Sequence, residues 1–360
     1  MTKGSLHGFA EKGRLMDHSA ALTRDSSISL IRLTGTVCIL LCHLSSWFGI
    51  AALAQLFNVG VPVFLLISGF LYGGKTIRPR SFFANRYLRL TLPIGLFVLL
   101  LSVYLFFFAR ESASFGTIGL YMLNLQGLNF VCGYIPYTEL CTGTGHLWFL
   151  TVLFICYFCL PLVSKCEKRI AFTREVRLVI LIVSCVAVAL LVQVQLYVSY
   201  FQIFFIGYFC KKFNWRIRCR TWLFWSGLTA AGIAVRLFFV LYGMDGSDWY
   251  LSVVALQQNV LAFWIFASFR FVYACRASLL DAIAESKFVK HSDSLSYYVY
   301  IVHYMFLVGP FDVSALGIGR IPECFVFLLA TILCAEALRG LTMLVQKAIE
   351  LPVRKLHAQA

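Results

Sequence analysis

The sequence predicts an all-α, polytopic integral membrane protein with about ten transmembrane helices. Hydrophobic residues make up 60% of the 360 residues and charged residues only 13%, whereas a soluble domain is about 45–50% apolar and about 25% charged. The mean hydropathy is +0.82. The apolar residues form separate runs of about 20 residues, the length at which a helix crosses the hydrocarbon core and satisfies its own backbone polar groups.

Ten segments are apolar enough to be counted as spans, and the sixth is the shortest. They are residues 28–48, 56–74, 91–109, 146–163, 178–197, 198–210, 221–241, 250–269, 295–313 and 323–344. We therefore expect a cytoplasmic N-terminal tail at 1–27, a transmembrane domain at 28–345 and a cytoplasmic C-terminal tail at 346–360. Residues 1–26 are polar and lack the apolar core of a cleaved signal peptide.

The basic residues support this count because they fall in alternate loops, as the positive-inside rule requires. Loops and tails on one side hold 26 of the 31 Lys and Arg residues, and the opposite loops hold only Arg110 and Arg320. This distribution predicts that both termini lie in the cytoplasm, and we expect the protein in the plasma (inner) membrane. The net charge of +15 is therefore a topology signal, and we expect no nucleic-acid partner.

Most of the 13 cysteines lie inside apolar runs, where free Cys packs as a small hydrophobic residue. Cys132 and Cys141 share the long loop at about 110–145, and the sequence leaves open whether they form a disulfide. We expect no metal site.

Polar groups within the spans are the candidate functional residues, because they are costly in hydrocarbon. In the first span, Arg32 and His43 are eleven residues apart, so they share a helix face and lie about 16 Å apart along the axis. One interpretation is structural: Arg32 extends its charged group to the membrane surface and His43 bonds to a backbone carbonyl. The other is that both residues line a path for a long anionic ligand entering from the cytoplasm. Arg236, Arg339 and His303 also lie within spans.

The second span contains Gly-Val-Pro-Val-Phe-Leu-Leu-Ile-Ser-Gly-Phe-Leu at 60–71. Its Gly and Ser residues allow close helix packing, and Pro62 predicts a kink or a broken turn. Just beyond it, Arg86 and Arg89 are three residues apart and share one helix face. They are either topology charges or a pair of guanidinium groups that binds phosphate oxygens.

Two later motifs complete the set. The fourth span opens with Gly145-His146-Leu-Trp148-Phe-Leu, in which both His146 and Trp148 could also be ordinary interfacial residues. The ninth contains Ser-Tyr-Tyr-Val-Tyr-Ile-Val-His at 296–303. Its Tyr300 and His303 either line a polar cavity or bond to neighbouring helices.

Taken together, these motifs resemble the acyltransferase-3 family of integral membrane O-acyltransferases, over nearly the whole chain. The chain resembles the short form of this family, which lacks a fused extracytoplasmic domain. The resemblance implies transfer of an acyl group, usually acetyl from acetyl-coenzyme A, to a hydroxyl of a cell-surface glycan or its lipid-linked precursor. It also assigns catalytic roles to Arg32 and His43. Many relatives carry a Glu shortly after the Trp-Phe-Leu motif, but here Thr151 to Phe154 contain no carboxylate.

Our hypothesis is that His43 accepts the hydroxyl proton or transiently carries the acyl group. Arg32, Arg86 and Arg89 would bind the coenzyme A phosphates. His146, Trp148, His303 and Tyr300 would bind or border the acceptor. The expected partners are acetyl-CoA or another acyl-CoA, a glycan or lipid-linked glycan acceptor, and membrane lipids. The sequence does not decide whether the protein forms a homo-oligomer.

Two other function classes fit parts of the pattern. One is a multi-span transporter or flippase of an anionic or glycan substrate, although no repeated pair of interrupted helices is evident. The other is an inactive scaffold that keeps the enzyme fold. The presence of Arg32, His43, Arg86 and Arg89 favours the enzyme.

Overall fold

The computed structural model describes residues 25–75, 77–109, 114–128, 139–169, 173–190, 195–244 and 247–358, and in these residues the chain is helical without strands. The α-helices are α2 (Ser26–Trp47), α3 (Ala51–Phe57), α4 (Gly60–Phe70), α5 (Pro79–Tyr104), α6 (Phe115–Met122), α8 (Trp148–Arg169), α9 (Arg174–Leu190), α10 (Gln195–Lys212), α11 (Cys219–Leu241), α12 (Asp248–Glu285), α13 (Lys287–Val302) and α14 (Arg320–Ala358). A π-helical turn, η1 (Leu105–Ala109), extends α5, and the 3-10 turns are η2 (Gly145–Leu147), η3 (His303–Phe306) and η4 (Val313–Leu316).

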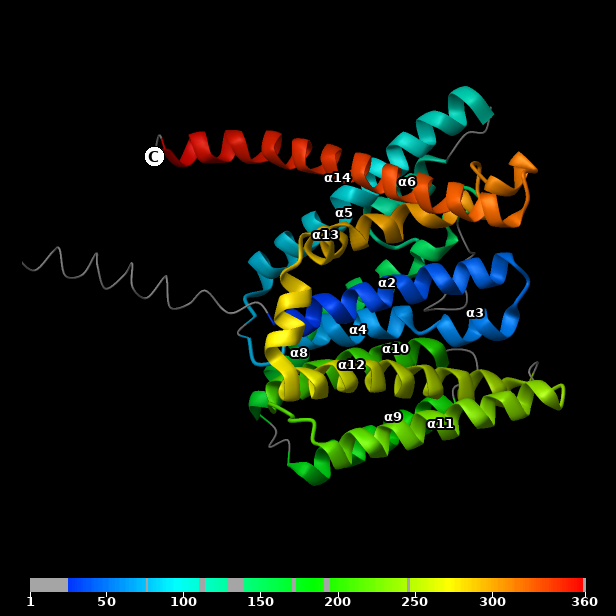
Figure 1. The fold of residues 1–360 in the computed structure, drawn as a ribbon. Helices are drawn as coiled ribbons and strands as arrows, with labels where there is room; N and C mark the ends of the chain where they lie inside the picture. The colour runs from blue at the N-terminus through cyan, green and yellow to red at the C-terminus, as the bar shows by residue number, and fades with distance from the viewer. Residues whose placement is uncertain are drawn as a thin grey trace, which may run out of the picture.

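Figure 1 shows these helices as an elongated bundle in which α2, α4, α10 and α12 run side by side, with α9 and α11 on one flank and α5, α13 and α14 on the other. Lys75, Arg86, Lys211 and Arg270 lie where α4 and α10 end, α5 begins and the long α12 approaches its bend. We call this the basic end of the bundle.

In the described part of the chain, seven helices are long and apolar enough to cross a membrane. They are Ser26–Trp47, Ala51–Phe70, Ser81–Ala109, Gly145–Glu167, Cys219–Leu241, Trp249–Glu285 and Arg320–Ile349. The expected all-α fold with several membrane-spanning helices is therefore confirmed. The three remaining expected spans fall on α9, α10 and α13, which do not meet these criteria in the described residues, so ten crossings stay a prediction.

The ninth expected span, 295–313, has the wrong bounds. Its α-helix covers Lys287–Val302 and then passes into η3 and a turn through Gly309 and Pro310. The helix begins earlier than hydropathy suggested because its polar first turns are capped by Ser286, whose side chain accepts a bond from the Val289 N–H. It ends earlier because the chain tightens into the 3-10 turn η3 at His303, and Pro310 farther along has no N–H with which an α-helix could resume.

The expected interruption of the second span is present, but it precedes Pro62. α3 ends at Phe57 and α4 begins at Gly60, so the break falls at Asn58 and Val59. Pro62 then occupies the first turn of α4, where its missing N–H removes no helical bond. Irregular backbone of this kind occurs at membrane depth where it is buried or lines a cavity.

Glycines set the distance between the central helices. A Cβ at Gly60 would lie 2.6 Å from the carbonyl oxygen of Gly35 on α2, and Cβ atoms at Gly69 and Gly207 would overlap the backbone of the opposite helix of the α4–α10 pair. The expected close packing of the Gly-rich segment is therefore present, and it holds α4 between α2 and α10.

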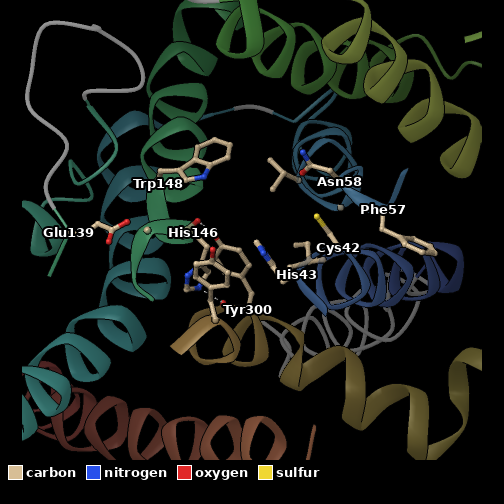
Figure 2. A pocket seen from close by; sticks show the side chains of 13 residues that line it. Cys42, His43, Phe57, Asn58, Glu139, His146, Trp148 and Tyr300 are labelled. Atoms are coloured by element: carbon tan, nitrogen blue, oxygen red, sulfur yellow. Dashed lines mark hydrogen bonds between the residues drawn. The ribbon is translucent and has the colours of Figure 1, made fainter. Parts of the chain in front are cut away.

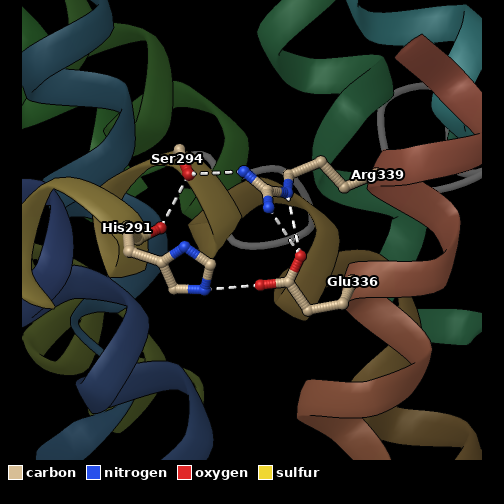
Figure 3. A network of polar contacts seen from close by, with 4 residues as sticks. All are labelled: His291, Ser294, Glu336 and Arg339. Carbon is tan, nitrogen blue, oxygen red and sulfur yellow. Dashed lines mark hydrogen bonds and ion pairs between the residues drawn. The ribbon is translucent and has the colours of Figure 1, made fainter.

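Arg339, one of the basic residues expected within a span, links α14 to α13. Its Nη2 lies 2.7 Å from a carboxylate oxygen of Glu336, and its Nη1 lies 3.2 Å from Ser294 Oγ. The other Glu336 oxygen lies 2.5 Å from His291 Nε2, so four side chains bridge the two helices (Figure 3). Glu336 therefore balances the charge of Arg339.

Several expectations fall outside the described residues. They concern the N-terminal tail up to residue 24, Arg110, and Cys132 with its suggested link to Cys141.

Candidate active site

A cavity of about 250 Å³ lies where four segments far apart in the sequence meet. These segments are the C-terminal part of α2, the α3–α4 break, η2 with the start of α8, and the end of α13 with η3. Its polar and aromatic lining residues are Cys42, His43, Phe57, Asn58, Glu139, His146, Trp148, Tyr300 and Tyr304. Figure 2 shows His43, Cys42 and Asn58 on one side of the cavity and His146, Trp148 and Tyr300 on the other.

His43 projects from α2 into this cavity, and its side chain is half-buried. Its ring centroid lies 4.5 Å from that of Tyr304 and 5.1 Å from that of His303. The ring is therefore held by aromatic contacts on one side, while the cavity leaves the other side accessible to a substrate. This position is suitable for a base or a nucleophile.

The side chains of His146 and Tyr300 each bond to the backbone carbonyl group of the other residue. Nε2 of His146 lies 2.8 Å from the carbonyl oxygen of Tyr300, so this nitrogen carries a proton and donates it. The Tyr300 hydroxyl in turn donates to the carbonyl oxygen of His146 at 2.5 Å. The pair ties the start of α8 to α13, so both residues line the cavity as parts of a rigid wall.

His303 is fully buried behind His43. Its Nδ1 lies 2.9 Å from the carbonyl oxygen of Tyr300, so Nδ1 carries the proton and Nε2 keeps a lone pair. Nε2 has no partner among the described residues. The ring also lies 4.8 Å from that of His146. The described His, Cys, Asp and Glu residues form no group of three that could hold a metal ion.

Five of these polar and aromatic lining residues were not among the predicted site residues: Cys42, Phe57, Asn58, Glu139 and Tyr304. Asn58 precedes the Gly-Val-Pro motif and Tyr304 follows His303, so their positions beside singled-out motifs were a usable signal. Glu139 places a carboxylate in the lining although none follows the Trp-Phe-Leu motif. Trp148 stacks on Tyr200, with ring centroids 5.4 Å apart, and so presents a fixed aromatic surface.

The predicted arginines lie outside the cavity lining, at the basic end. Nη1 of Arg32 lies 2.5 Å from Oδ1 of Asp293, whose side chain is 1% exposed. Arg32 therefore has a buried counter-ion, which the sequence analysis missed although Asp293 lies three residues before the Ser-Tyr-Tyr motif. The buried Tyr157 lies within electrostatic reach of both Arg32 and Arg86, so the structure brings these two arginines into one region.

Arg86 lies among other cations. Its guanidinium group is 4.8 Å from the ring centre of Tyr72, and the ammonium group of Lys75 is 5.6 Å from the same ring. Lys211 lies 5.2 Å from the Phe70 ring. Burial, followed by the charges of Arg86 and Lys211, lowers the pKa of Lys75.

No acidic side chain among the described residues pairs with Lys75, Arg86 or Lys211. Arg89 is exposed on the same helix, α5, within reach of Tyr72. The basic end therefore carries positive charge that the described side chains do not balance.

Comparison with known proteins decides the family. A family model described as "Acyltransferase domain" matches residues 25–339. The chain belongs to the acyltransferase-3 family. The resemblance found from the motifs is thereby confirmed over most of the chain, and the protein is a membrane acyltransferase. No curated protein and no solved structure matches it.

Proposed function

We propose that this acyltransferase moves an acyl group, most simply acetyl, from acyl-coenzyme A to a hydroxyl of a cell-surface glycan or its lipid-linked precursor. One arrangement carries the proposal. His43 lines a cavity near one end of α2. The basic end of the bundle lies toward the other end of this helix (Figure 1), and its Lys75, Arg86 and Lys211 pair with no carboxylate among the described residues.

The basic end supports binding of the donor's phosphates. Arg86 and Arg89 provide guanidinium groups for phosphate oxygens, and Lys75 and Lys211 add two ammonium groups beside them. Arg32 uses part of its donor capacity on Asp293 and keeps other N–H groups for a ligand, since a guanidinium has five. The separation of Arg32 and His43, about 16 Å along the axis, is of the order of an extended pantetheine arm.

The chemical step then takes place at His43. An imidazole nitrogen accepts the proton of the acceptor hydroxyl while the hydroxyl oxygen attacks the thioester carbonyl carbon. The carbon–sulfur bond breaks, and the departing thiolate takes the proton from His43. The products are the O-acylated glycan and free coenzyme A, without a further reactant.

The acceptor would occupy the remaining cavity. The wall formed by His146 and Tyr300 shapes this space, and the Trp148 ring offers a surface for the apolar face of a sugar. His303, whose ring contacts that of His43, would support the cavity from behind. In this proposal the protein lies in the plasma (inner) membrane. Its basic end faces the cytoplasm, because acyl-coenzyme A is a cytoplasmic metabolite.

The test is transfer of label from acetyl-coenzyme A to membrane-associated glycan by wild type and His43→Ala. We expect His43→Ala to abolish transfer while detergent-extracted protein keeps its thermal stability. His291→Ala is the matched control, because His291 is a half-exposed His that lies on α13 and pairs with Glu336 outside the cavity.

Full transfer by His43→Ala would exclude the proposed role. Movement of an unmodified solute without labelled glycan would instead favour a transporter.

A further inference from the structure

Arg236 is a buried cation on α11 that the proposed reaction does not use. It is 7% exposed. Its Nη2 donates to Gln55 Oε1 at 3.0 Å and its Nη1 donates to Gln257 Oε1 at 2.9 Å. The guanidinium group therefore links α11 to α3 and α12.

All of these partners are neutral. Arg32, Arg270 and Arg339 each pair with an acidic side chain, whereas no carboxylate among the described residues pairs with Arg236. A buried charge without a counter-charge is costly, and more so at membrane depth. A neutral side chain could pack between these helices without the cost of a buried charge. We therefore look for a function of the charge on Arg236.

The position of Arg236 relates it to the active-site cavity. Gln55 lies on α3, whose last turn and C-cap, Phe57 and Asn58, line the cavity. Cys42, which also lines it, lies within electrostatic reach of Arg236. Arg236 is 17 residues from the start of α11, and His43 is 17 residues from the start of α2. Each therefore lies about 25 Å along its helix from that helix's first residue.

The surroundings of Arg236 have unused hydrogen-bonding capacity. Nε2 of Gln257 on α12 belongs to the amide whose oxygen accepts from Arg236; it is buried and has no partner among the described residues. The guanidinium makes three bonds to the two glutamines, which leaves one N–H on each terminal nitrogen. Two parallel N–H groups bind the two oxygens of a carboxylate or phosphate.

We infer that Arg236 binds an anionic group of the acceptor at the edge of the His43 cavity. This inference rests on the proposed function and narrows its substrate class. The acceptor is an acidic glycan, or a glycan joined to its lipid by phosphate. In either case the oxyanion supplies the counter-charge that Arg236 lacks and holds the acceptor hydroxyl near His43.

The test compares two matched pairs of probes by titration calorimetry on the full chain in detergent. One pair is a glucuronate-containing oligosaccharide and its carboxyl-reduced form. The other is a short prenyl diphosphate and the corresponding prenol. We expect wild type to bind at least one anionic probe about tenfold more tightly than its neutral counterpart. Arg236→Gln should lose this preference, and Arg236→Lys should keep only part of it because an ammonium group does not bind bidentately.

Arg320→Gln is the matched control. It removes one positive charge on the face of the Trp47 ring, at an exposed position outside the cavity lining, and should keep the preference. If Arg236→Gln does not fold, Arg236→Lys carries the comparison.

The inference is overturned if neither anionic probe is preferred by wild type, or if both Arg236 variants keep the full preference. It is also overturned if the variants change only the retention of phosphatidylglycerol from lipid nanodiscs, because the cation would then serve a bilayer lipid. Acetyl-coenzyme A binding and His43-dependent transfer are measured in parallel, so failure of the proposed function is seen separately.

Discussion

Arg32 and Arg86 lie at the same end of the bundle in opposite electrostatic settings. Arg32 is held by the buried carboxylate of Asp293. Arg86 and Lys75 both lie beside the Tyr72 ring, which brings like charges together. Such crowding is unfavourable unless an anion binds. At the residue scale, the binding of donor phosphates is therefore expected to depend more on Arg86 and Lys75 than on Arg32.

The lowered pKa of Lys75 predicts the pH dependence of donor binding. Because its pKa lies below the usual value of 10.5, Lys75 loses its proton at a lower pH than an ordinary lysine. Coenzyme A affinity should therefore fall as the pH rises into the alkaline range. Lys75→Arg keeps the charge throughout, so its affinity should fall only at higher pH. Calorimetric titrations across pH would measure this shift, with the exposed Lys287→Arg as control, and coincident profiles of wild type and Lys75→Arg would contradict it.

His303 should act on His43 through the lone pair of its buried Nε2. In His303→Asn, the amide nitrogen replaces Nδ1 and can still donate to the Tyr300 carbonyl, but nothing replaces Nε2. Nε2 has no partner among the described residues, but it can accept a hydrogen bond from His43 once His43 has taken the hydroxyl proton. We expect loss of this one bond to lower kcat about tenfold, with little change in KM. Steady-state kinetics with both substrates would measure kcat and KM separately. A wild-type kcat in this variant would show that His303 only fills space.

At the scale of elements, the central helices depend on glycine for their separation. Gly207 on α10 faces the carbonyl group of Leu66 on α4 without room for a Cβ, whereas a Cβ on Gly227 of α11 would meet no atom within 4 Å. Both positions are helical. They differ only in what lies opposite, which makes them a matched pair.

Gly207→Ala should destabilise the protein by about 1–3 kcal/mol, because the added methyl group forces α4 and α10 apart. Gly227→Ala should be neutral or stabilising by up to about 1 kcal/mol, the intrinsic preference of a helix for Ala over Gly. Thermal unfolding of both variants in detergent would measure the difference. Equal stability of the two would show that α4 and α10 are not packed as described.

Hydropathy and helix period predicted where the helices lie in the sequence, but they did not predict which helices and side chains contact one another. The long apolar runs marked α2, α5, α8, α11 and α14, and the period of α2 placed Arg32 and His43 on one face. The pairing of Arg32 with Asp293 joins residues 261 positions apart, and no local pattern contains that information. Lys75 and Lys211 looked like ordinary topology charges, since only folding brings them beside Arg86.

At the scale of the whole molecule, the open question is the number of crossings. α10 lies against α4, and its Ile203, Phe204 and Tyr208 are fully buried, so a position outside the membrane would expose a packed helix. α13 carries Tyr300 and ends at the cavity. Its first turns are polar, which explains why composition alone does not mark it as a span. Both helices run alongside helices that do qualify (Figure 1).

We therefore predict ten crossings, with the C-terminal residue on the same side as the basic end. Crossing by α13 puts the η4 region, 313–316, on the opposite side, and α14 then returns. If α13 did not cross, η4 would lie on the basic side and the end of α14 on the other. Alkaline phosphatase fused after Gly317 should be active outside the cytoplasm, and green fluorescent protein fused after Ala360 should fluoresce inside. The reverse pattern would rule out a crossing by α13 and would remove the proposed route from a cytoplasmic donor site to His43.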